Sequence, residues 1–348
     1  MPNLVIGGGP AGAVLAAKLA ARREAVTLLE RSDGPHHKIC GEFLSWEGRA
    51  LLRRAGIDIE SLGGASISRL RIVAKARTAE TKLPGEALGI SRYRLDERLL
   101  EEARRRGVDV RRGRDVRRWS EGIAHLADDG AFTGERTWLA TGKRDLRGAA
   151  RDLAGERISN DLTGFKLHLR LADADARAIA NTIELHHFDG GYAGLQPIED
   201  GLANLCLLAE RDLASGGWDA VRAHLGRAAP QLASQLDRAE PQMDTPLAIA
   251  RVPYGFVSRT NDGPIRIGDQ LAVIHSFTGD GLSLAIASGM AAAEGREPRE
   301  MVAKPVGRAA LAYRLLAGGG WPLDAVLAVP RLASHAARWT RVRYPERL

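Results

Sequence analysis

The sequence has few of the features that mark several common classes of protein. Only Cys40 and Cys206 are cysteines among its 348 residues, which excludes a disulfide framework and favours a reducing compartment. No apolar run reaches the roughly 20 residues that a membrane-spanning helix needs. An apolar stretch begins at the third residue, which leaves no room for a cleaved signal peptide. These absences predict a cytoplasmic protein.

Patterns for metal or nucleic-acid binding are also missing. His36-His37 lies in a predicted loop, and His186-His187 lies on a predicted strand, where neighbouring side chains point to opposite faces. Neither pair has the ligand pattern of a metal site, so we predict no bound metal. The net charge is +7 and the pI about 9.7, which indicates an anionic ligand or an acidic neighbour. The basic residues are scattered among acidic ones rather than clustered with aromatics, so we expect no nucleic acid as a partner.

The sequence does contain a glycine-rich turn close to its start. Gly7, Gly9 and Gly12 fit the spacing G-x-G-x-x-G and stand between an apolar strand and an alanine-rich helix. The first glycine permits a sharp turn, the second lets the backbone approach a pyrophosphate, and the third lets helix and strand pack closely. The helix that begins near Ala11 directs its N–H groups and its positive dipole end toward that phosphate. This pattern predicts a dinucleotide site.

The residues that follow the turn extend the same site. A second apolar strand, residues 25–29, ends at Glu30, where a carboxylate can bind a ribose hydroxyl. Arg31 and Lys38 can hold the charge of the adenosine or the pyrophosphate. Cys40 either contacts the cofactor or substrate or is a small buried side chain.

The remaining elements alternate between helix and strand. Helices are expected at residues 46–55, capped by Ser45, and at 95–106, 218–225, 230–238 and 282–293. Strands are expected at residues 66–73, at a second stretch ending at 84–85, and at 108–110, 116–119, 123–126, 132, 137–142, 165–171, 182–188, 202–209 and 265–267.

Four more motifs accompany the first glycine turn, and together they resemble one family. They are Lys38-x-Cys40-Gly41, Arg92-x-x-Leu95-Asp96, Ala140-Thr141-Gly142, and Gly268-Asp269 followed by Thr278-Gly279-Asp280-Gly281. In this combination the chain resembles the FAD enzymes of the p-hydroxybenzoate hydroxylase superfamily, and within it the geranylgeranyl-reductase-type flavoproteins. The resemblance covers roughly residues 1–295.

The last motif has a chemical reason to accompany a flavin. Asp269 at a strand end can accept hydrogen bonds from ribityl hydroxyls, and the turn before the helix at Leu282 can bring N–H groups against the flavin carbonyls. We therefore predict FAD as the cofactor, with NAD(P)H as a transient co-substrate because no second glycine fingerprint appears. The predicted cofactor-binding residues are Gly7, Gly9, Pro10, Ala11, Gly12, Glu30, Arg31, Lys38, Cys40, Gly41, Arg92, Thr141, Gly142, Gly268, Asp269, Thr278, Gly279, Asp280, Gly281 and Leu282.

The resemblance implies an α/β fold with a Rossmann-like FAD-binding domain, an inserted antiparallel sheet and a helical C-terminal segment. The FAD-binding domain is expected in three pieces, residues 1–65, 86–150 and 258–300. The substrate domain is expected at residues 66–85 and 151–257, and the C-terminal segment at 301–348. Arginines and apolar faces in that last segment suit peripheral contact with a membrane. The protein is expected to be a monomer or a homodimer.

The predicted substrate wall departs from the family pattern. Prenyl reductases have Tyr-x-Trp-x-Phe-Pro where this chain has Tyr192-Ala193-Gly194-Leu195-Gln196-Pro197. Glycine in place of tryptophan and glutamine in place of phenylalanine imply a reshaped, more polar pocket. The predicted substrate-binding residues are Lys166, His168, Tyr192 and Gln196. His275 is the candidate for proton transfer, with a hydrogen bond to a turn as its alternative role.

Three functions are compatible with these residues, and we predict the first of them. The first is an NAD(P)H-dependent monooxygenase that uses O₂ to hydroxylate or oxidise an aromatic or polyketide-like molecule. The second is a reductase or dehydrogenase of the geranylgeranyl-reductase type that acts on a hydrophobic substrate, and the third is a flavin-bound RNA-associated protein. The Trp-x-Trp-x-Ile-Pro signature of flavin-dependent halogenases is absent, which argues against halogenation.

Overall fold

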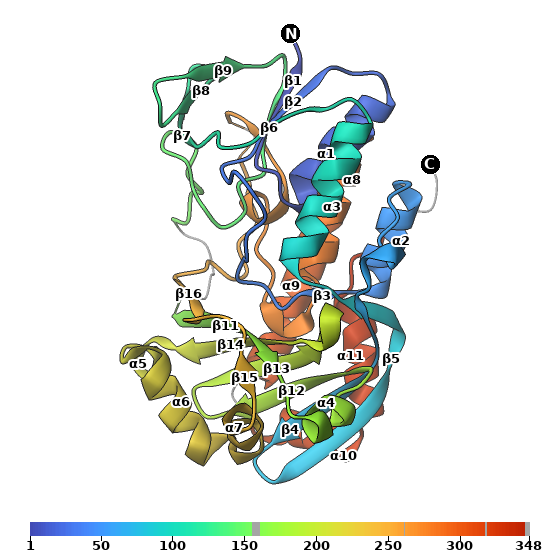
Figure 1. The fold of residues 1–348 in the computed structure, drawn as a ribbon, viewed down its shortest axis with the longest axis vertical. Helices are drawn as coiled ribbons and strands as arrows, with labels where there is room; N and C mark the ends of the chain where they lie inside the picture. Colours follow the sequence, from blue (N-terminus) through green and yellow to red (C-terminus); the bar gives the residue numbers. More distant parts are fainter. Residues whose placement is uncertain (155–160, 261, 317–318, 345–348) are drawn as a thin grey trace.

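A computed structural model describes residues 1–154, 161–260, 262–316 and 319–344 (Figure 1). Its first layer is a parallel sheet in the order β17-β10-β1-β2-β6. The strands are β1 (Asn3–Ile6), β2 (Val26–Leu29), β6 (Asp109–Arg111), β10 (Thr137–Leu139) and β17 (Ile265–Arg266). Strands β1 and β2 are buried along their whole length, which explains their continuous apolar runs. Strand β2 pairs with one edge of β1, and β10 pairs with the other edge. The strand order therefore reverses at β1, and the carboxyl ends of β1 and β10 form the topological switch point at which sheets of this kind bind ligands.

Three helices cover this parallel sheet. They are α1 (Pro10–Ala21), α3 (Arg92–Arg105) and α8 (Gly281–Ala293). Helices α1 and α8 are almost entirely apolar because each is buried on most of its surface. They pack closely at Gly289, where a Cβ atom would lie 2.4 Å from the carbonyl oxygen of Ala11. The first turn of α1 therefore packs against the second half of α8.

The second layer is a large sheet in the order β15-β11-β14-β13-β12-β4-β5-β3, with β16 also paired to β11. All its pairs are antiparallel except β12 with β4. Its strands are β3 (Phe43–Leu44), β4 (Ala65–Ala74), β5 (Arg77–Gly89), β11 (Leu162–Arg170), β12 (Thr182–Phe188), β13 (Gly191–Pro197), β14 (Ala203–Glu210), β15 (Glu240–Pro241) and β16 (Leu247–Ala250).

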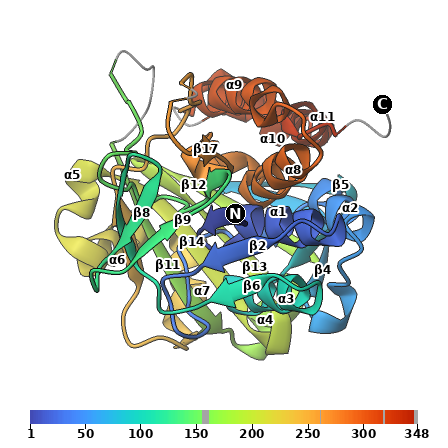
Figure 2. The ribbon, with the colours of Figure 1, turned by 90° about the horizontal axis from the view of Figure 1, so that it is seen from above.

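Helices lie against this large sheet, and the C-terminal ones are gathered on one side of the molecule (Figure 2). A small third sheet stands apart from the large sheet (Figure 1). Apolar side chains of β11, β13 and β14 pack against α6 (Gly217–Ala228) and α7 (Pro230–Asp237). Apolar side chains of β4 pack against the C-terminal helices α10 (Trp321–Ala328) and α11 (Arg331–Thr340), which lie beside α9 (Pro298–Leu316). The third sheet consists of β7 (Val116–Ser120), β8 (Ile123–Leu126) and β9 (Ala131–Thr133).

The remaining elements are short. The other helices are α2 (Trp46–Arg54), α4 (Asp173–Ala178) and α5 (Arg211–Ala214), and the 3₁₀ turns are η1 (Glu60–Leu62), η2 (Glu199–Gly201), η3 (Gly268–Gln270) and η4 (Ser276–Thr278). Ser45 caps α2 as predicted, because its Oγ accepts a hydrogen bond from the backbone N–H of Gly48. Across the described ranges we find no helix long and apolar enough to cross a bilayer.

The predicted fold class, a Rossmann-like FAD domain with a mainly antiparallel sheet and C-terminal helices, is confirmed. The structure adds strand β13, which the sequence analysis did not predict as a strand, and it extends β5 past Pro84-Gly85 to Gly89. The domain boundaries stay a prediction. Residues 345–348 of the expected C-terminal segment and residues 155–160 of the expected substrate domain lie outside the described residues.

Candidate active site

The first part of the site is the turn between β1 and α1. Gly7 has a φ of +109°, which favours glycine, and a Cβ atom there would lie 2.4 Å from the carbonyl oxygen of Ala140. A Cβ on Gly12 would lie 2.0 Å from the carbonyl oxygen of Gly7, so the helix packs directly on the turn. Helix α1 has no side-chain cap and no acidic residue in its first turn. Its N–H groups are therefore available to a phosphate.

Glu30 fixes the turn from the neighbouring strand. Its Oε2 accepts a hydrogen bond from the N–H of Gly8 at 2.7 Å, and its Oε1 accepts one from Ser32 at 3.1 Å. Although burial raises the pKa of Glu30, the charge of Lys38 and these two N–H groups lower it below its ordinary value. Glu30 is therefore a carboxylate at neutral pH, with acceptor capacity left for a ribose hydroxyl.

The second part of the site comes from the far end of the chain. Gly279 has a φ of +67°, and the following Asp280 and Gly281 begin helix α8, again with no side-chain cap and no acidic residue in the first turn. Gly268 and Asp269 precede this segment and lie at the same cavity. The helix dipoles of α1 and α8 thus both end at one cavity, which is the arrangement that a negatively charged dinucleotide requires.

That cavity has a volume of about 570 Å³, within the range of small-molecule sites. Seventeen of the twenty predicted cofactor-binding residues line it, the exceptions being Gly12, Thr278 and Asp280. Its lining carries more cationic than anionic side chains. The cations are Arg31, Lys38, Arg92, Arg114, Lys143 and Arg144, and the carboxylates are Glu30, Glu42 and Asp269. The donor set and the glycine cradles fit FAD, whose diphosphate is anionic.

Two of the predicted cofactor-binding residues, Arg92 and Lys38, form an ion-pair cluster with Asp96 beside the cavity. The guanidinium of Arg92 donates to the carboxylate of Asp96 at 2.6 and 2.7 Å, and Lys38 Nζ donates to the same carboxylate at 2.8 Å. Although burial raises the pKa of Asp96, Arg92 and Lys38 lower it. The carboxylate therefore orients both cations at the wall of the cavity.

A buried carboxylate that the sequence did not single out, Glu42, holds the segment before β3 against strand β11 of the large sheet. Glu42 has no exposed surface, and its carboxylate accepts hydrogen bonds from Lys166 and from His168 Nε2, the latter at 2.7 Å. Burial raises the pKa of Glu42, but the His168 hydrogen bond and the Lys166 charge lower it below its ordinary value. Gln196 Nε2 donates to the carbonyl oxygen of Glu42 at 2.9 Å.

These contacts give three of the predicted substrate-binding residues a partner within the protein. Lys166 and His168 were predicted to bind the substrate, but both are buried and hold the segment 38–42 against the large sheet. Gln196 holds the same segment and also lines a second cavity. Substrate contact by Lys166 and His168 stays a prediction, and the structure assigns them an internal carboxylate.

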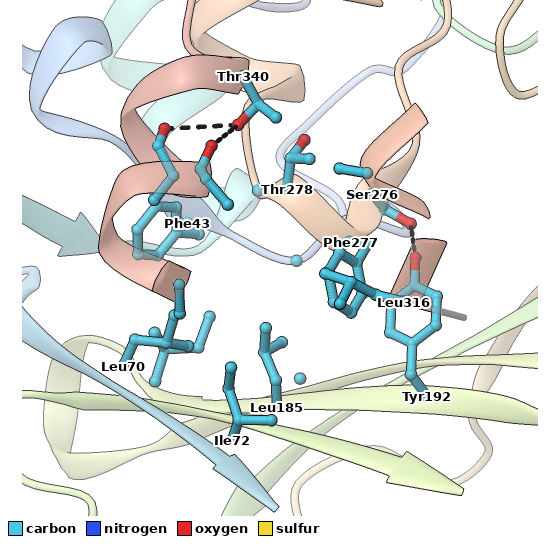
Figure 3. Close-up of a pocket in the computed structure, with 18 of the residues that line it drawn as sticks. Phe43, Leu70, Ile72, Leu185, Tyr192, Ser276, Phe277, Thr278, Leu316 and Thr340 are labelled. Carbon is cyan, nitrogen blue, oxygen red and sulfur yellow. Dashed lines mark hydrogen bonds between the residues drawn. The ribbon is translucent and has the colours of Figure 1, made fainter. Parts of the chain in front are cut away.

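The second cavity lies between the large sheet and the C-terminal helices (Figure 3). Aliphatic side chains of β4, β5 and β12 form one wall, and those of α9, α10 and α11 form another. The aliphatic wall residues are Leu70, Ile72, Leu83, Ile183, Leu185, Ala312, Leu316, Val326, Ala333, Ala336 and Ala337. Six residues, Gly41, Phe43, Cys206, Leu208, Ser276 and Gly279, line both cavities, so the apolar cavity adjoins the cofactor cavity.

Few polar atoms mark the junction of the two cavities. The hydroxyl of Tyr192 and the Oγ of Ser276 are 2.8 Å apart, and both residues line the apolar cavity (Figure 3). Burial raises the pKa of Tyr192 well above its ordinary value, so this hydroxyl stays protonated. The junction can therefore offer one hydroxyl pair to a bound molecule. The other polar residues of the lining are Gln196, Thr278, Thr340 and Arg341, and the remaining lining is suited to hydrocarbon.

His275, the predicted proton-transfer residue, is not among the residues that line either cavity. Its ring is stacked between Tyr313, with centroids 4.3 Å apart, and Tyr254, with centroids 5.3 Å apart. Burial, together with the charge of Arg314, lowers the pKa of His275 to about 4. The imidazole is therefore neutral at pH 7 and has no extra proton to donate, and its catalytic role stays a prediction.

Two other predicted residues have structural partners. The carboxylate of Asp280 turns away from the cofactor cavity and accepts hydrogen bonds from the N–H of Val342 at 2.9 Å and from Arg341 at 3.2 Å. Thr278 lines the apolar cavity, and its hydroxyl donates to the carbonyl oxygen of His275. Within the described residues, no group of three or more potential metal ligands lies together.

Comparison with known proteins agrees with this geometry. A family model described as an FAD binding domain matches residues 1–146. The chain is 27% identical over 314 residues to digeranylgeranylglycerophospholipid reductase 2 of Methanopyrus kandleri, covering 84% of this chain and 75% of the relative. It is 25% identical over 309 residues to menaquinone reductase of Mycolicibacterium smegmatis, with the same two coverages.

A solved structure has the same fold. The geranylgeranyl bacteriochlorophyll reductase-like protein of Thermoplasma acidophilum superposes with a TM-score of 0.75 over 98% of this chain and 93% of its own, at 18% identity. The prediction that FAD is the cofactor is confirmed.

Proposed function

We propose that this FAD-dependent oxidoreductase, which has the fold of the p-hydroxybenzoate hydroxylase superfamily, reduces carbon–carbon double bonds in the isoprenoid chain of a lipid. The observation that carries the proposal is the aliphatic cavity that adjoins the cofactor cavity. When bound, FAD supplies hydride chemistry, and NAD(P)H is the electron donor. The chain's own residues bind and orient the two molecules and exclude water.

The cavity walls support a hydrocarbon occupant. Branched aliphatic side chains from two layers face each other, and burying an isoprenoid chain there contributes about 25 cal/mol for each Å² of apolar surface removed from water. A phenol or polyketide would present several hydroxyls or carbonyls, which need matched polar partners when they are buried. Tyr192 and Ser276 offer only one such pair at the junction.

Residues at the junction set the orientation of the bound chain. Gly41, Gly279 and Ser276 are small residues among the six that line both cavities, so the cofactor and the isoprenoid chain can approach each other at these positions. The contacts of Glu42 with Lys166 and His168 hold residues 38–42 in place. A rigid, water-poor junction of this kind keeps a double bond next to the reacting ring.

The names of the two relatives support the same substrate class. One is named a reductase of a digeranylgeranylglycerophospholipid, and the other a reductase of menaquinone. Both named substrates are lipids that carry an isoprenoid chain. This likeness favours reduction over the hydroxylation that the sequence analysis placed first.

Hydroxylation of an aromatic molecule is the second candidate. The hydroxyl pair of Tyr192 and Ser276 at the junction favours it, because it would suit a phenolic oxygen beside the cofactor. O₂ would then be consumed together with NAD(P)H.

Anaerobic incubation of the FAD-loaded protein with NADPH or NADH and a geranylgeranyl lipid tests the proposal. We expect mass spectrometry to show a gain of two hydrogens for each double bond reduced. Substrate-dependent O₂ consumption with phenols, and no reduction of the lipid, would contradict the proposal and favour the second candidate.

A further inference from the structure

The C-terminal helices expose an unusual number of large apolar side chains. Helices α9, α10 and α11, with the turn between the last two, carry six of the nine large hydrophobic residues that are exposed in the described part of the chain. These are Leu311, Leu315, Trp321, Val329, Leu332 and Trp339, which are 41 to 78% exposed. We call these six residues the outer apolar set. Such a concentration indicates an interaction surface, since single exposed hydrophobics are normally scattered.

The spacing of these residues places several of them on shared helix faces. Arg308, Leu311 and Leu315 of α9 are three and four residues apart, and Leu332 and Trp339 of α11 are seven apart, so each group lies on one side of its helix. The two faces meet, because the guanidinium of Arg308 lies 5.6 Å from the ring centroid of Trp339 and donates to its carbonyl oxygen.

The same helices line the apolar cavity from the inside. Ala312 and Leu316 of α9 and Ala333, Ala336 and Ala337 of α11 line the cavity, while Leu311, Leu315, Leu332 and Trp339 of the same helices are exposed. A layer one helix thick therefore separates the cavity, whose lining Figure 3 shows, from the outer apolar set. Figure 2 shows α9, α10 and α11 gathered on one side of the molecule.

The charge of this segment complements an anionic surface. Residues 301–344 contain seven basic side chains and a single acidic one, Asp324. Exposed among the basic ones are Lys304, Arg314, Arg331, Arg338 and Arg343. Apolar and aromatic side chains interleaved with arginine are the composition of helices that lie in the interfacial region of a bilayer.

We propose that the outer apolar set docks on an anionic lipid bilayer, with α9 and α11 lying on its surface. The leucines and tryptophans enter the interfacial region, and the exposed arginines contact lipid phosphates. We also infer that the isoprenoid chain of the substrate passes from the bilayer between these helices into the cavity, and this second step rests on the proposed function.

Co-sedimentation of the FAD-loaded protein with vesicles tests the docking without any need for turnover. One vesicle preparation contains phosphatidylcholine with phosphatidylglycerol, and the other contains phosphatidylcholine alone. We expect binding to the anionic vesicles that weakens with salt. Arg331→Gln/Arg338→Gln should weaken that binding by up to about 30-fold, since each basic residue near the surface contributes about a five-fold effect. Leu311→Ser/Leu315→Ser should weaken binding to both preparations.

Matched variants elsewhere keep the test specific. Ile265→Ser removes an apolar side chain that is 39% exposed in the parallel sheet, and Arg23→Gln/Arg104→Gln removes two exposed charges from that domain. Both controls should bind vesicles like the unchanged protein, and all variants should retain flavin absorbance and melting temperature. Equal binding by the control and C-terminal variants, or no vesicle binding at all, would overturn the docking proposal. So would a self-associated protein that Leu311→Ser/Leu315→Ser makes monomeric, because a second copy would then cover this face.

A substrate comparison separates this inference from the proposed function. If both hold, the C-terminal variants reduce a water-soluble short isoprenoid normally but lose turnover on geranylgeranyl lipid embedded in vesicles. Vesicle binding without reduction of either substrate would contradict the proposed function and leave the docking established. Reduction of both substrates by the C-terminal variants at the unchanged rate would overturn docking as the route of entry.

Discussion

At Gly12 the packing of α1 on the glycine turn leaves no room for a side chain. A Cβ atom would lie 2.0 Å from the carbonyl oxygen of Gly7, which is backbone and cannot move aside without opening the turn. We expect Gly12→Ala to destabilise the protein by about 1–3 kcal/mol and to abolish FAD binding. Gly34→Ala is the control, because nothing lies within 4 Å of its Cβ position. Flavin absorbance after purification measures FAD binding, and thermal unfolding measures stability. A yellow, stable Gly12→Ala variant would contradict the assignment of this turn to the FAD site.

The lowered pKa of His275 predicts that the stability of the protein depends on pH in a specific way. Its pKa is lowered to about 4 in the folded protein and is near 6.5 when unfolded, so below pH 6.5 the unfolded state binds more protons. The neutral imidazole therefore makes its full contribution to the free energy of unfolding above pH 6.5. That contribution is lost as the pH falls to 4, and the loss is at most about 3 kcal/mol.

His275→Phe should keep the stack with Tyr254 and Tyr313 and remove this dependence. The variant should gain stability relative to the unchanged protein as the pH falls from 6.5 to 4, as measured by denaturant midpoints. It should also retain reduction of the flavin by NAD(P)H if His275 has a structural role. A parallel pH dependence in both proteins would show that His275 does not titrate in this way, and lost flavin reduction would favour proton transfer.

The sequence indicated the position of some site residues and gave no indication for others. Gly7, Gly12 and Glu30 were predictable because their roles depend on neighbours close in sequence. Glu42 gave no signal, since a carboxylate after Cys40-Gly41 fits no pattern until Lys166 and His168 arrive from a strand more than 120 residues away. For the same reason Lys166 and His168 were predicted to contact the substrate.

At the scale of elements, Asp280 connects the start of α8 to the chain beyond α11. Its partner Arg341 is buried, and the guanidinium lies 4.8 Å from the ring centroid of Trp46. Asp280→Ala would leave this cation unpaired, so we expect a loss of about 3–5 kcal/mol in stability and faster proteolysis of α11. Asp324→Ala, which removes an exposed partner of Arg77, should cost less than about 1 kcal/mol. Equal losses in the two variants would contradict a role for Asp280 in holding α11.

The elements that were missed lack strong local patterns. Strand β13 contains Gly191, Gly194 and Pro197, which disfavour a strand when read alone, but it lies in the interior of the large sheet between β12 and β14. Cross-strand pairing and burial override the local preference there. Strand β5 continues past Pro84-Gly85 because its last residues, Leu88 and Gly89, pair with β4 on one edge and with β3 on the other.

At the scale of the whole molecule, the apolar cavity could not be predicted from the sequence. Its walls come from β4 and β5 near the start of the chain, β12 in the middle, and α9 to α11 at the end. Each wall has the apolar pattern of an ordinary core element, and only the assembled fold leaves a space between them. The departure at Gly194 was visible in the sequence, but its effect on the shape of the cavity was not.

Gly194 offers a way to fill the cavity without touching the cofactor site. It lines the apolar cavity but not the cofactor cavity, and a Cβ atom there would meet its neighbours at 3.7 and 3.8 Å, which is ordinary contact. Gly194→Trp should retain FAD and its reduction by NAD(P)H, and it should lower turnover of an isoprenoid substrate at least about ten-fold. Gly194→Ala should change turnover little. Steady-state kinetics of the two variants separate a blocked cavity from a damaged flavin site.

The account depends most on electron transfer from FAD to a molecule held in the apolar cavity. Its most direct measurement is the rate at which pre-reduced flavin is reoxidised under anaerobic conditions after a geranylgeranyl lipid is added. The account predicts rapid return of the flavin absorbance in the unchanged protein and little return in Gly194→Trp. Flavin that stays reduced with the lipid in the unchanged protein, or that is reoxidised equally fast in Gly194→Trp, would contradict it.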